Sequence, residues 1–339
     1  MLKTKLTEAY QLAHPFISAG MAFVATVPLV RAVCAAGGMG ILGATAMPPD
    51  QMRNAIRDLR NAGATSFGLD IIPRFNTQDH IDICVQEKVP VVVFFWDEAP
   101  AEWIPRLHAG GCRVWVQVGS VEEATAAISS GADALIVQGS EAGGHNRAVA
   151  ATLSLLPAVI DAVGPVPVIA AGGIADGRAV AAVLALGAEA VWVGTRLLAS
   201  EEAFAHDEYK RRVLAAKVQD TARHFIFGPE FPDASTRGLR NRLVREWEGR
   251  DAPPPYKTAP AETLPIIGQA VIFGQSIPLQ RFMGFPPTPE FTGDFEQMSL
   301  LAGESVAQTR KLQPVAEIIR EMMQDAEAVI KERMLRMLS

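Results

Sequence analysis

Apolar runs that are typical of buried strands recur at nearly even intervals through the first 200 residues of the chain. Eight such runs cover residues 15–20, 38–43, 66–71, 90–96, 112–118, 134–139, 167–173 and 190–195. Alanine-rich segments with helical periodicity separate them, for example at residues 51–61, 121–130 and 178–186. Because parallel sheets are covered by helices and their strands are buried on both faces, this alternation predicts an α/β fold.

The number of units decides between two α/β architectures. Eight strand–helix units of about 25 residues each fit a closed (β/α)8 TIM barrel, with an open doubly wound sheet as the alternative. Residues 38–43 match the G-x-G-x-x-G pattern of dinucleotide-binding loops. They lie within the second strand, however, whereas a dinucleotide loop joins a strand to a helix. The even spacing and the glycine-rich turns after the last two strands favour the barrel.

Local signals mark the ends of the helices. Glycine adopts the left-handed conformation that commonly follows a helix, and it stands at Gly63, Gly110, Gly111, Gly131, Gly164 and Gly187. Side chains that can accept a hydrogen bond from the first free amides of a helix stand at Asp50, Ser120 and Asp176.

The character of the chain changes after the eighth strand. We expect the barrel to occupy residues 1–200, a cap subdomain residues 201–298, and a C-terminal helix residues 299–339. Residues 201–220 look helical, and residues 221–295 are irregular and rich in proline and arginine. Such a long stretch is interpreted as a subdomain, since structureless loops of that length are uncommon. An apolar stripe over residues 312–338 predicts a helix that packs back on the barrel or, alternatively, on a second subunit of a homodimer.

Composition excludes several classes of protein. A net charge of -6 argues against a nucleic-acid partner. No uncharged apolar run is long enough to span a membrane, and the N-terminus lacks the apolar core of a signal peptide, so we expect a cytoplasmic protein. The three cysteines, Cys34, Cys84 and Cys112, are far apart and lack metal-type spacing, so we expect reduced core residues and no metal site.

The active site of a barrel of this kind lies at the C-terminal ends of its strands, and phosphate often binds after strands seven and eight. Here these turns carry Gly172 and Gly173, and then Val193, Gly194 and Thr195. Exposed glycine amides at a helix N-terminus attract an anion, and the Thr195 hydroxyl adds a donor. We therefore predict a phosphate site, although Gly172 and Gly173 could serve the tight turn alone.

Other strand ends carry groups suited to a flat polar ring. Gly20 and Met21 follow the first strand, Asp70 ends the third, Gln117 lies near the end of the fifth, and Gln138 ends the sixth. Amide and carboxyl groups there can form hydrogen bonds with the edge of such a ring. The alternative for Asp70 and Gln117 is an ordinary polar group on the barrel rim.

A glycine-rich turn after the sixth strand carries a histidine. Gly143 and Gly144 allow positive φ, and His145 titrates near neutrality, so the turn is a candidate for acid–base chemistry. A solvated loop histidine is the alternative, and Glu141 would either tune His145 or bind solvent.

We expect the remaining histidines to be structural or solvated and not to take part in chemistry. We place His14 at the bottom of the barrel, His80 and His108 on solvated outer helices, and His206 and His224 in structural positions of the cap. A cluster of arginines is interpreted as the solvated face of a helix: Arg237, Arg240, Arg242 and Arg245.

Taken together, these segments resemble the nitronate monooxygenase (formerly 2-nitropropane dioxygenase) family. These flavin-dependent barrels are related to the FMN-containing enoyl-acyl-carrier-protein reductases. The resemblance extends over the whole barrel and into the cap, through residues 15–21, 37–40, 138–145, 171–174, 193–196, 202–206 and 236–241.

The resemblance implies FMN bound noncovalently at the barrel mouth. Gly20 and Met21 would line the flavin ring, Gln138 and Gly143 would contact it, and the glycines after the last two strands, with Thr195, would hold its phosphate. His145 falls on the family's active-site histidine.

In the implied reaction an alkyl nitronate gives an electron to the flavin, O2 reacts, and a carbonyl compound and nitrite are released. A neutral nitroalkane would first lose its α-proton to His145. The partners are then a small-molecule substrate and O2.

The chain departs from the family pattern at two positions, and two other functions stay open. Asp70 stands where relatives often have asparagine, and Gln117 where they often have lysine. A charged Asp70 would disfavour a reduced anionic flavin unless it is protonated or paired. The alternatives are an NAD(P)H-dependent flavin reductase acting on an enoyl thioester or a quinone, and a flavin-free barrel that binds a phosphate ligand.

Overall fold

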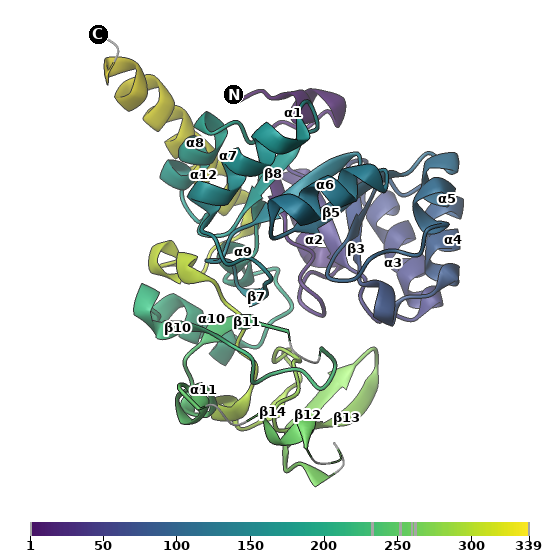
Figure 1. The fold of residues 1–339 in the computed structure, drawn as a ribbon, viewed down its shortest axis with the longest axis vertical. Coiled ribbons are helices and arrows are strands. Elements are labelled where there is room, and N and C mark those ends of the chain that lie inside the picture. The colour runs from purple at the N-terminus through teal and green to yellow at the C-terminus, as the bar shows by residue number, and fades with distance from the viewer. Residues whose placement is uncertain (1, 232–233, 251–252, 259, 261–262, 338–339) are drawn as a thin grey trace.

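The computed structural model describes residues 2–231, 234–250, 253–258, 260 and 263–337. Its largest sheet has eight parallel strands: β1 (Phe16–Ser18), β2 (Gly40–Gly43), β3 (Phe67–Ile71), β4 (Val91–Phe94), β5 (Arg113–Val118), β6 (Ala134–Gln138), β8 (Val168–Ala171) and β9 (Ala190–Val193). Consecutive strands of this sheet are neighbours, and a parallel bridge between Ile17 and Met39 joins β1 to β2. The sheet is a nearly closed barrel, so the predicted TIM-barrel fold is confirmed (Figure 1).

Helices follow the barrel strands and cover the outside of the sheet: α2 (Val27–Ala35), α3 (Pro49–Asn61), α4 (Gln78–Gln86), α5 (Trp103–Ala109), α6 (Val121–Ser129), α7 (Thr152–Val163), α8 (Gly177–Ala185) and α9 (Thr195–Leu198). The prediction that glycines end the helices is confirmed, since φ lies between +71° and +100° at Gly63, Gly111, Gly131, Gly164 and Gly187.

Two of the three predicted N-caps are confirmed. The Ser120 hydroxyl accepts from the amide of Glu123 at 3.1 Å, and the Asp176 carboxylate accepts from the amide of Ala179 at 3.0 Å. The prediction for Asp50 is wrong, because α3 already begins at Pro49. Proline fits the first helical position, where an amide would lack a partner in any case.

The N-terminal end of the barrel is filled by α1 (Lys5–Ala9) and the residue that follows it. Thr4 donates to the carbonyl of Glu189 just before β9, at 2.7 Å. Tyr10 meets Trp115 edge-on, with ring centroids 5.4 Å apart, and accepts a hydrogen bond from its indole nitrogen at 3.1 Å. Packing at this end leaves the C-terminal ends of the strands as the place for a ligand.

The glycines at residues 38–43 serve close packing of the backbone. A Cβ at Gly40 would lie 2.5 Å from the carbonyl oxygen of Val30 in α2, and one at Gly43 would lie 2.5 Å from the carbonyl oxygen of Met21. Both distances are shorter than any normal contact, so only glycine fits. The segment belongs to β2, as predicted, and α3 starts only at Pro49.

The described part of the segment that we expected to form a cap lies at one end of the barrel and is called the cap below (green in Figure 1). Its elements are α10 (Asp207–Ala215), β10 (Thr221–His224), β11 (Thr236–Leu239), α11 (Arg242–Trp247), β12 (Ile266–Ile272), β13 (Gln275–Gln280) and β14 (Thr292–Gly293). The α-helix in residues 201–220 is thus shorter than predicted. β10 and β11 form an antiparallel sheet with β7 (Gly144–His145), which lies in the glycine-rich turn after β6.

The C-terminal helix α12 (Val315–Ala328) packs against α8 and α2, so its predicted return to the barrel is confirmed. A Cβ at Gly177 would lie 2.3 Å from the amide nitrogen of Ala326, which shows how closely α8 approaches α12. α12 begins three residues later than predicted, and a π-helical segment (Val329–Met334) and a 3-10 turn (Leu335–Met337) continue it. Leu338 lies outside the described residues.

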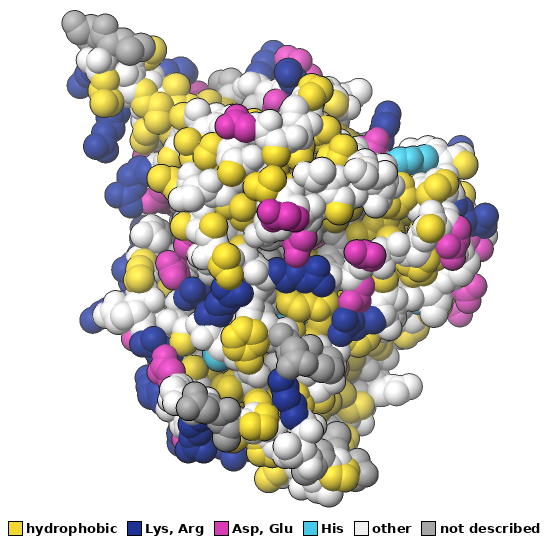
Figure 2. Space-filling model, viewed as in Figure 1, with side chains coloured by type: hydrophobic (Ala, Val, Ile, Leu, Met, Phe, Trp, Pro, Cys, Tyr) yellow, Lys and Arg dark blue, Asp and Glu magenta, His cyan; other side chains and the backbone are white. Residues whose placement is uncertain are grey.

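On the face drawn in Figure 2, basic and acidic side chains are interspersed with apolar ones. None of the described helices has the length and apolar character needed to cross a membrane. All three cysteines are free, with Cys84 and Cys112 buried and Cys34 half-buried.

Replacing Ser120 with alanine tests the cap of α6. Removal of the hydroxyl leaves the amide of Glu123 without its acceptor, so the free energy of unfolding should fall by about 1 kcal/mol in urea titrations followed by circular dichroism. Ser129→Ala is the matched control at the other end of α6, where the hydroxyl only donates to a carbonyl of its own helix. An equal fall in the free energy of unfolding in the two variants would show that the loss of the cap is not the cause of the destabilisation.

Candidate functional site

A cavity of about 280 Å³ opens at the C-terminal ends of the barrel strands, between the barrel and the cap. Twelve of the thirteen predicted site residues line it: Gly20, Met21, Asp70, Gln117, Gln138, Gly143, Gly144, His145, Gly172, Gly173, Gly194 and Thr195. The exception is Val193, whose side chain is fully buried in the hydrophobic core and does not reach the cavity. Segments that are far apart in the sequence therefore meet at one space.

The turns after β8 and β9 present backbone to this cavity. Gly172 has φ +106° and Gly173 has φ +74°, a region that strains other residues. A Cβ at Gly172 would also lie 2.9 Å from the hydroxyl oxygen of Thr152. The Thr195 hydroxyl accepts from the amide of Gly303 at 3.0 Å, which leaves its own hydrogen to donate. The two turns thus form a small backbone cradle with one hydroxyl beside it.

A segment before α12 closes one side of the cavity, and no sequence pattern predicted this contact. Leu301 and Ser305 line the wall. A Cβ at Gly143 would lie 2.5 Å from the carbonyl carbon of Ala302, so glycine is required where this segment crosses the turn after β6. Leu301 and Ser305 therefore belong to the wall of the site, although they lie in the unit of residues 299–339 that we assigned to the C-terminal helix.

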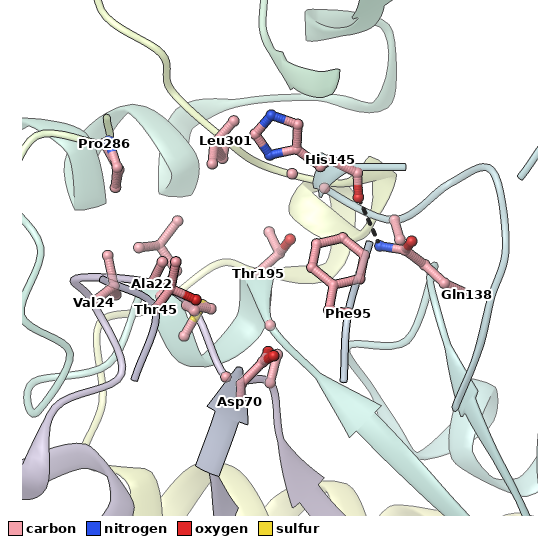
Figure 3. Close-up of a pocket in the computed structure, with 18 of the residues that line it drawn as sticks. Ala22, Val24, Thr45, Asp70, Phe95, Gln138, His145, Thr195, Pro286 and Leu301 are labelled. Atoms are coloured by element: carbon pink, nitrogen blue, oxygen red, sulfur yellow. Dashed lines mark hydrogen bonds between the residues drawn. The ribbon is translucent and has the colours of Figure 1, made fainter. Parts of the chain in front are cut away.

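Asp70 lies at the end of β3, opposite His145 across the cavity (Figure 3). Its side chain is only 5% exposed, and a Cβ at Gly20 would lie 2.6 Å from its Oδ2 atom. Oδ1 has no hydrogen-bond partner among the described residues. Burial raises the pKa of Asp70 well above its usual range and so favours the neutral form of the carboxyl group.

His145 is fixed by the pairing of β7 with cap strand β11, where it stands opposite Thr236. The Gln138 side chain donates to its carbonyl oxygen at 3.2 Å, the bond drawn in Figure 3. Its ring lies 4.0 Å from the ring of Phe231 and 5.6 Å from that of Trp96, measured between centroids. Burial lowers the pKa of His145 to about 4, helped by the charge of Arg74, so the imidazole is neutral over the physiological range.

Aromatic side chains make much of the remaining wall, and sequence reasoning missed all of them. They come from separate barrel loops and from the cap: Phe23, Phe75, Phe95, Phe231 and Phe285. Glu230 also lines the cavity, where its Oε2 atom accepts from the amide of Gly284 at 3.1 Å. Burial raises the pKa of Glu230. The wall is therefore mainly apolar, with a few polar groups at fixed points.

Two expectations about charged residues are wrong. Glu141 does not act on His145, because its carboxylate accepts from the amide of Thr152 at 2.9 Å and so caps α7. Arg237 does not lie on a helix. It stands in β11, donates to the carbonyl of Ser140 at 2.9 Å and pairs with Glu304 at 3.1 Å. It thus fastens the glycine-rich turn to the cap.

The expectation that His80 is solvated is also wrong. The residue is 4% exposed, accepts from the amide of Thr77 at 3.0 Å, and bonds through Nε2 to the carbonyl of Met47 at 2.8 Å. His108 does lie on an outer helix, where it pairs with Asp133 at 2.9 Å. Across the described residues, no three histidine, cysteine or acidic side chains are grouped so as to hold a metal ion.

Comparison with known proteins identifies the family. The model of the family described as "Nitronate monooxygenase" matches residues 3–80 and 72–325. A protein of Rhodococcus jostii (strain RHA1) is 42% identical over 222 residues. It is named (3aS,4S,5R,7aS)-5-hydroxy-7a-methyl-1-oxo-octahydro-1H-indene-4-carboxyl-CoA dehydrogenase, and the match spans 65% of this chain and 62% of the relative. The chain thus aligns with less than two thirds of that relative's length.

Solved structures agree with this assignment. FabK from Thermotoga maritima superposes with a TM-score of 0.80 and 33% identity, over 100% of both chains. Nitroalkane oxidase from Streptomyces ansochromogenes superposes with a TM-score of 0.76 and 28% identity, over 98% of this chain and 99% of the other. Because the family model matches nearly the whole sequence and these structures share its fold, the chain belongs to the nitronate monooxygenase family of oxidoreductases.

Proposed function

We propose that this protein oxidises alkyl nitronates with O2 to carbonyl compounds and nitrite, using FMN bound in the cavity. One observation carries the proposal: a glycine cradle, the buried Asp70 carboxyl group and the His145 imidazole surround one mainly apolar space. The nitroalkane oxidase that superposes on this chain supports the same class of substrate.

The residues present fit FMN. Gly172, Gly173, Gly194 and Thr195 would hold the phosphate, because glycine amides and a hydroxyl donor suit an anion. Gly20 and Met21 would lie against the ring, and Gln117 and Gln138 at its edge. Asp70 Oδ1 is buried and unpartnered, and a buried polar atom of this kind needs a hydrogen-bond partner. As a neutral carboxyl group, Asp70 can donate to a ring atom and adds no negative charge beside it.

FMN would supply the electron acceptor, and the chain's own groups would handle the substrate and its proton. Nε2 of His145 is buried, whereas Nδ1 is not among the buried unpartnered atoms and is therefore the nitrogen open to the cavity. For a neutral nitroalkane, the α-carbon proton would pass to Nδ1, and the electron pair of the broken bond would stay on the nitronate. A nitronate added in its anionic form skips this step, and His145 then orients it. The aromatic wall would keep water away from the substrate in both cases, the nitroalkane and the nitronate.

A second function is favoured by the Rhodococcus jostii relative, which is named as a dehydrogenase of a CoA thioester. Asp70 and His145 would also be available to donate or accept a proton in the reduction or dehydrogenation of a thioester. Anaerobic mixing separates the two functions: bleaching of the flavin by NAD(P)H without reaction towards a nitronate would favour the thioester enzyme. A purified protein without flavin absorbance that also rejects added FMN would favour the flavin-free phosphate barrel.

Replacement of His145 tests the base. We expect His145→Ala to retain flavin absorbance and to lose about 10²–10⁴-fold in turnover of a neutral nitroalkane, because general base catalysis typically contributes that much. Nitrite release per bound flavin is the measurement. His108→Ala is the control, since that histidine lies on an outer helix and pairs with Asp133. Unchanged nitrite release by His145→Ala would remove the residue from the mechanism.

The pH dependence of turnover tests the environment of His145. Only the neutral imidazole accepts a proton, so activity falls as pH drops through the pKa. With a pKa of about 4, turnover of a neutral nitroalkane should stay level from pH 8 down to pH 5.5, where about 97% of the imidazole is neutral. An ordinary histidine would be only about 10% neutral at pH 5.5. A decline centred near pH 6.5 would therefore contradict the buried, neutral state.

Substitution of Asp70 tests its protonation state. Asn has the same shape as the neutral carboxyl group and keeps a donor, so Asp70→Asn should bind FMN about as tightly as the wild type. Asp70→Ala loses the hydrogen bond and should bind about tenfold more weakly, as expected for a loss of about 1.4 kcal/mol. Fluorescence titration of the apoprotein with FMN measures both affinities. Equal weakening in the two variants would mean that the charged carboxylate is required.

A further inference from the structure

Three polar side chains form a row across the small sheet that carries His145. In the β10–β11–β7 sheet, Thr236 stands opposite His145 on one side and opposite His224 on the other. Directly opposed residues of antiparallel strands point to the same face of the sheet, with Cβ atoms about 4.5–5.5 Å apart. His145, Thr236 and His224 therefore lie side by side on one face, and the row leads from the cavity into the cap.

The polar atoms of this row are buried and lack partners. Nε2 of His145, the hydroxyl oxygen of Thr236 and both ring nitrogens of His224 have no hydrogen bond within the described chain. Thr236 is fully buried. Buried polar groups are nearly always satisfied, so four unpartnered atoms in one row indicate a function or a bound water that joins them.

The charge state of the row suits proton transfer. Burial lowers the pKa of both histidines to about 4, with Arg74 adding to the effect at His145 and Arg237 at His224. Each imidazole is then neutral, with one nitrogen that donates and one that accepts. A threonine hydroxyl both accepts and donates, so it can link two such rings. A valine would fill the same space without an unsatisfied hydroxyl, so packing gives no reason for threonine here.

We propose that His145, Thr236 and His224, joined by bound water, form a proton-transfer row that removes the substrate's proton from the cavity. The inference rests on the proposed function. The α-carbon proton of a neutral nitroalkane binds to Nδ1 of His145, and the electron pair stays on the nitronate. The proton on Nε2 passes through a bridging water to the Thr236 hydroxyl, which gives its own proton through a second water to a ring nitrogen of His224. The base is thereby neutral again before the nitronate recaptures a proton.

Thr236→Val tests the row with little risk to the fold, because it removes a buried hydroxyl that has no partner. In the flavin-loaded protein, turnover of a neutral nitroalkane should fall about tenfold or more, while turnover of the same compound supplied as its nitronate stays within about twofold. The solvent isotope effect on the neutral substrate should rise. His224→Gln should behave in the same way.

Thr221→Val is the matched control, since this threonine of the same sheet is 5% exposed and its hydroxyl has partners: it donates to the carbonyl of Val218 and accepts from the side chain of Arg237. Equal losses with both substrates in Thr236→Val and His224→Gln would indicate a merely structural role and overturn the row. So would unchanged turnover of the neutral substrate in both variants. If the wild type oxidises neither the nitroalkane nor its nitronate, the proposed function itself is wrong, and the row loses its role with it.

Discussion

Burial of the ionisable groups that line one cavity is the constraint on which the site depends. Burial disfavours the charged form of every ionisable group, so it raises the pKa of an acid and lowers the pKa of a base. Burial raises the pKa of Asp70 and lowers that of His145, so one physical cause favours the neutral form of both. A neutral carboxyl group donates a hydrogen bond, and a neutral imidazole accepts a proton. Burial in the same cavity therefore favours a hydrogen-bond donor at Asp70 and, in the proposed reaction, a proton acceptor at His145.

The barrel and the cap share the task of building this site. The barrel supplies Asp70 and the glycine turns from the ends of its strands, where the backbone is held on both sides by neighbours in the sheet. His145 is different, because β7 is paired with a cap strand and not with the barrel. Arg237 adds a second link, through the Ser140 carbonyl and Glu304. A shift of the cap would thus move the imidazole relative to the barrel groups.

Sequence patterns within short windows predicted the features that depend on neighbouring residues alone. The strands, the helix-ending glycines and the placement of His145 after β6 follow from apolar runs and glycine positions, all of which are visible within short windows. Phe231, Glu230 and Leu301 reach the cavity through long-range packing, which leaves no trace in the neighbouring sequence. His80 was misplaced for the same reason, since its burial depends on the carbonyl of Met47, 33 residues away. The neutral state of Asp70 likewise depends on its surroundings and not on its neighbours in the chain.

The barrel and the cap contribute different residues to the cavity, and this difference affects which substrates fit. In the proposed function, the proton leaves through His145 and the row behind it and the cofactor binds at the strand ends, so neither task discriminates strongly among apolar substrates. Selection falls to the aromatic wall, where Phe231 and Phe285 come from the cap and Phe75 and Phe95 from barrel loops. An added methylene in an apolar pocket changes binding by only about 1–3 kcal/mol, so such a wall tolerates related substrates. Changes in these side chains would alter the substrate while the carboxyl group, the glycine cradle and the imidazole keep the chemistry.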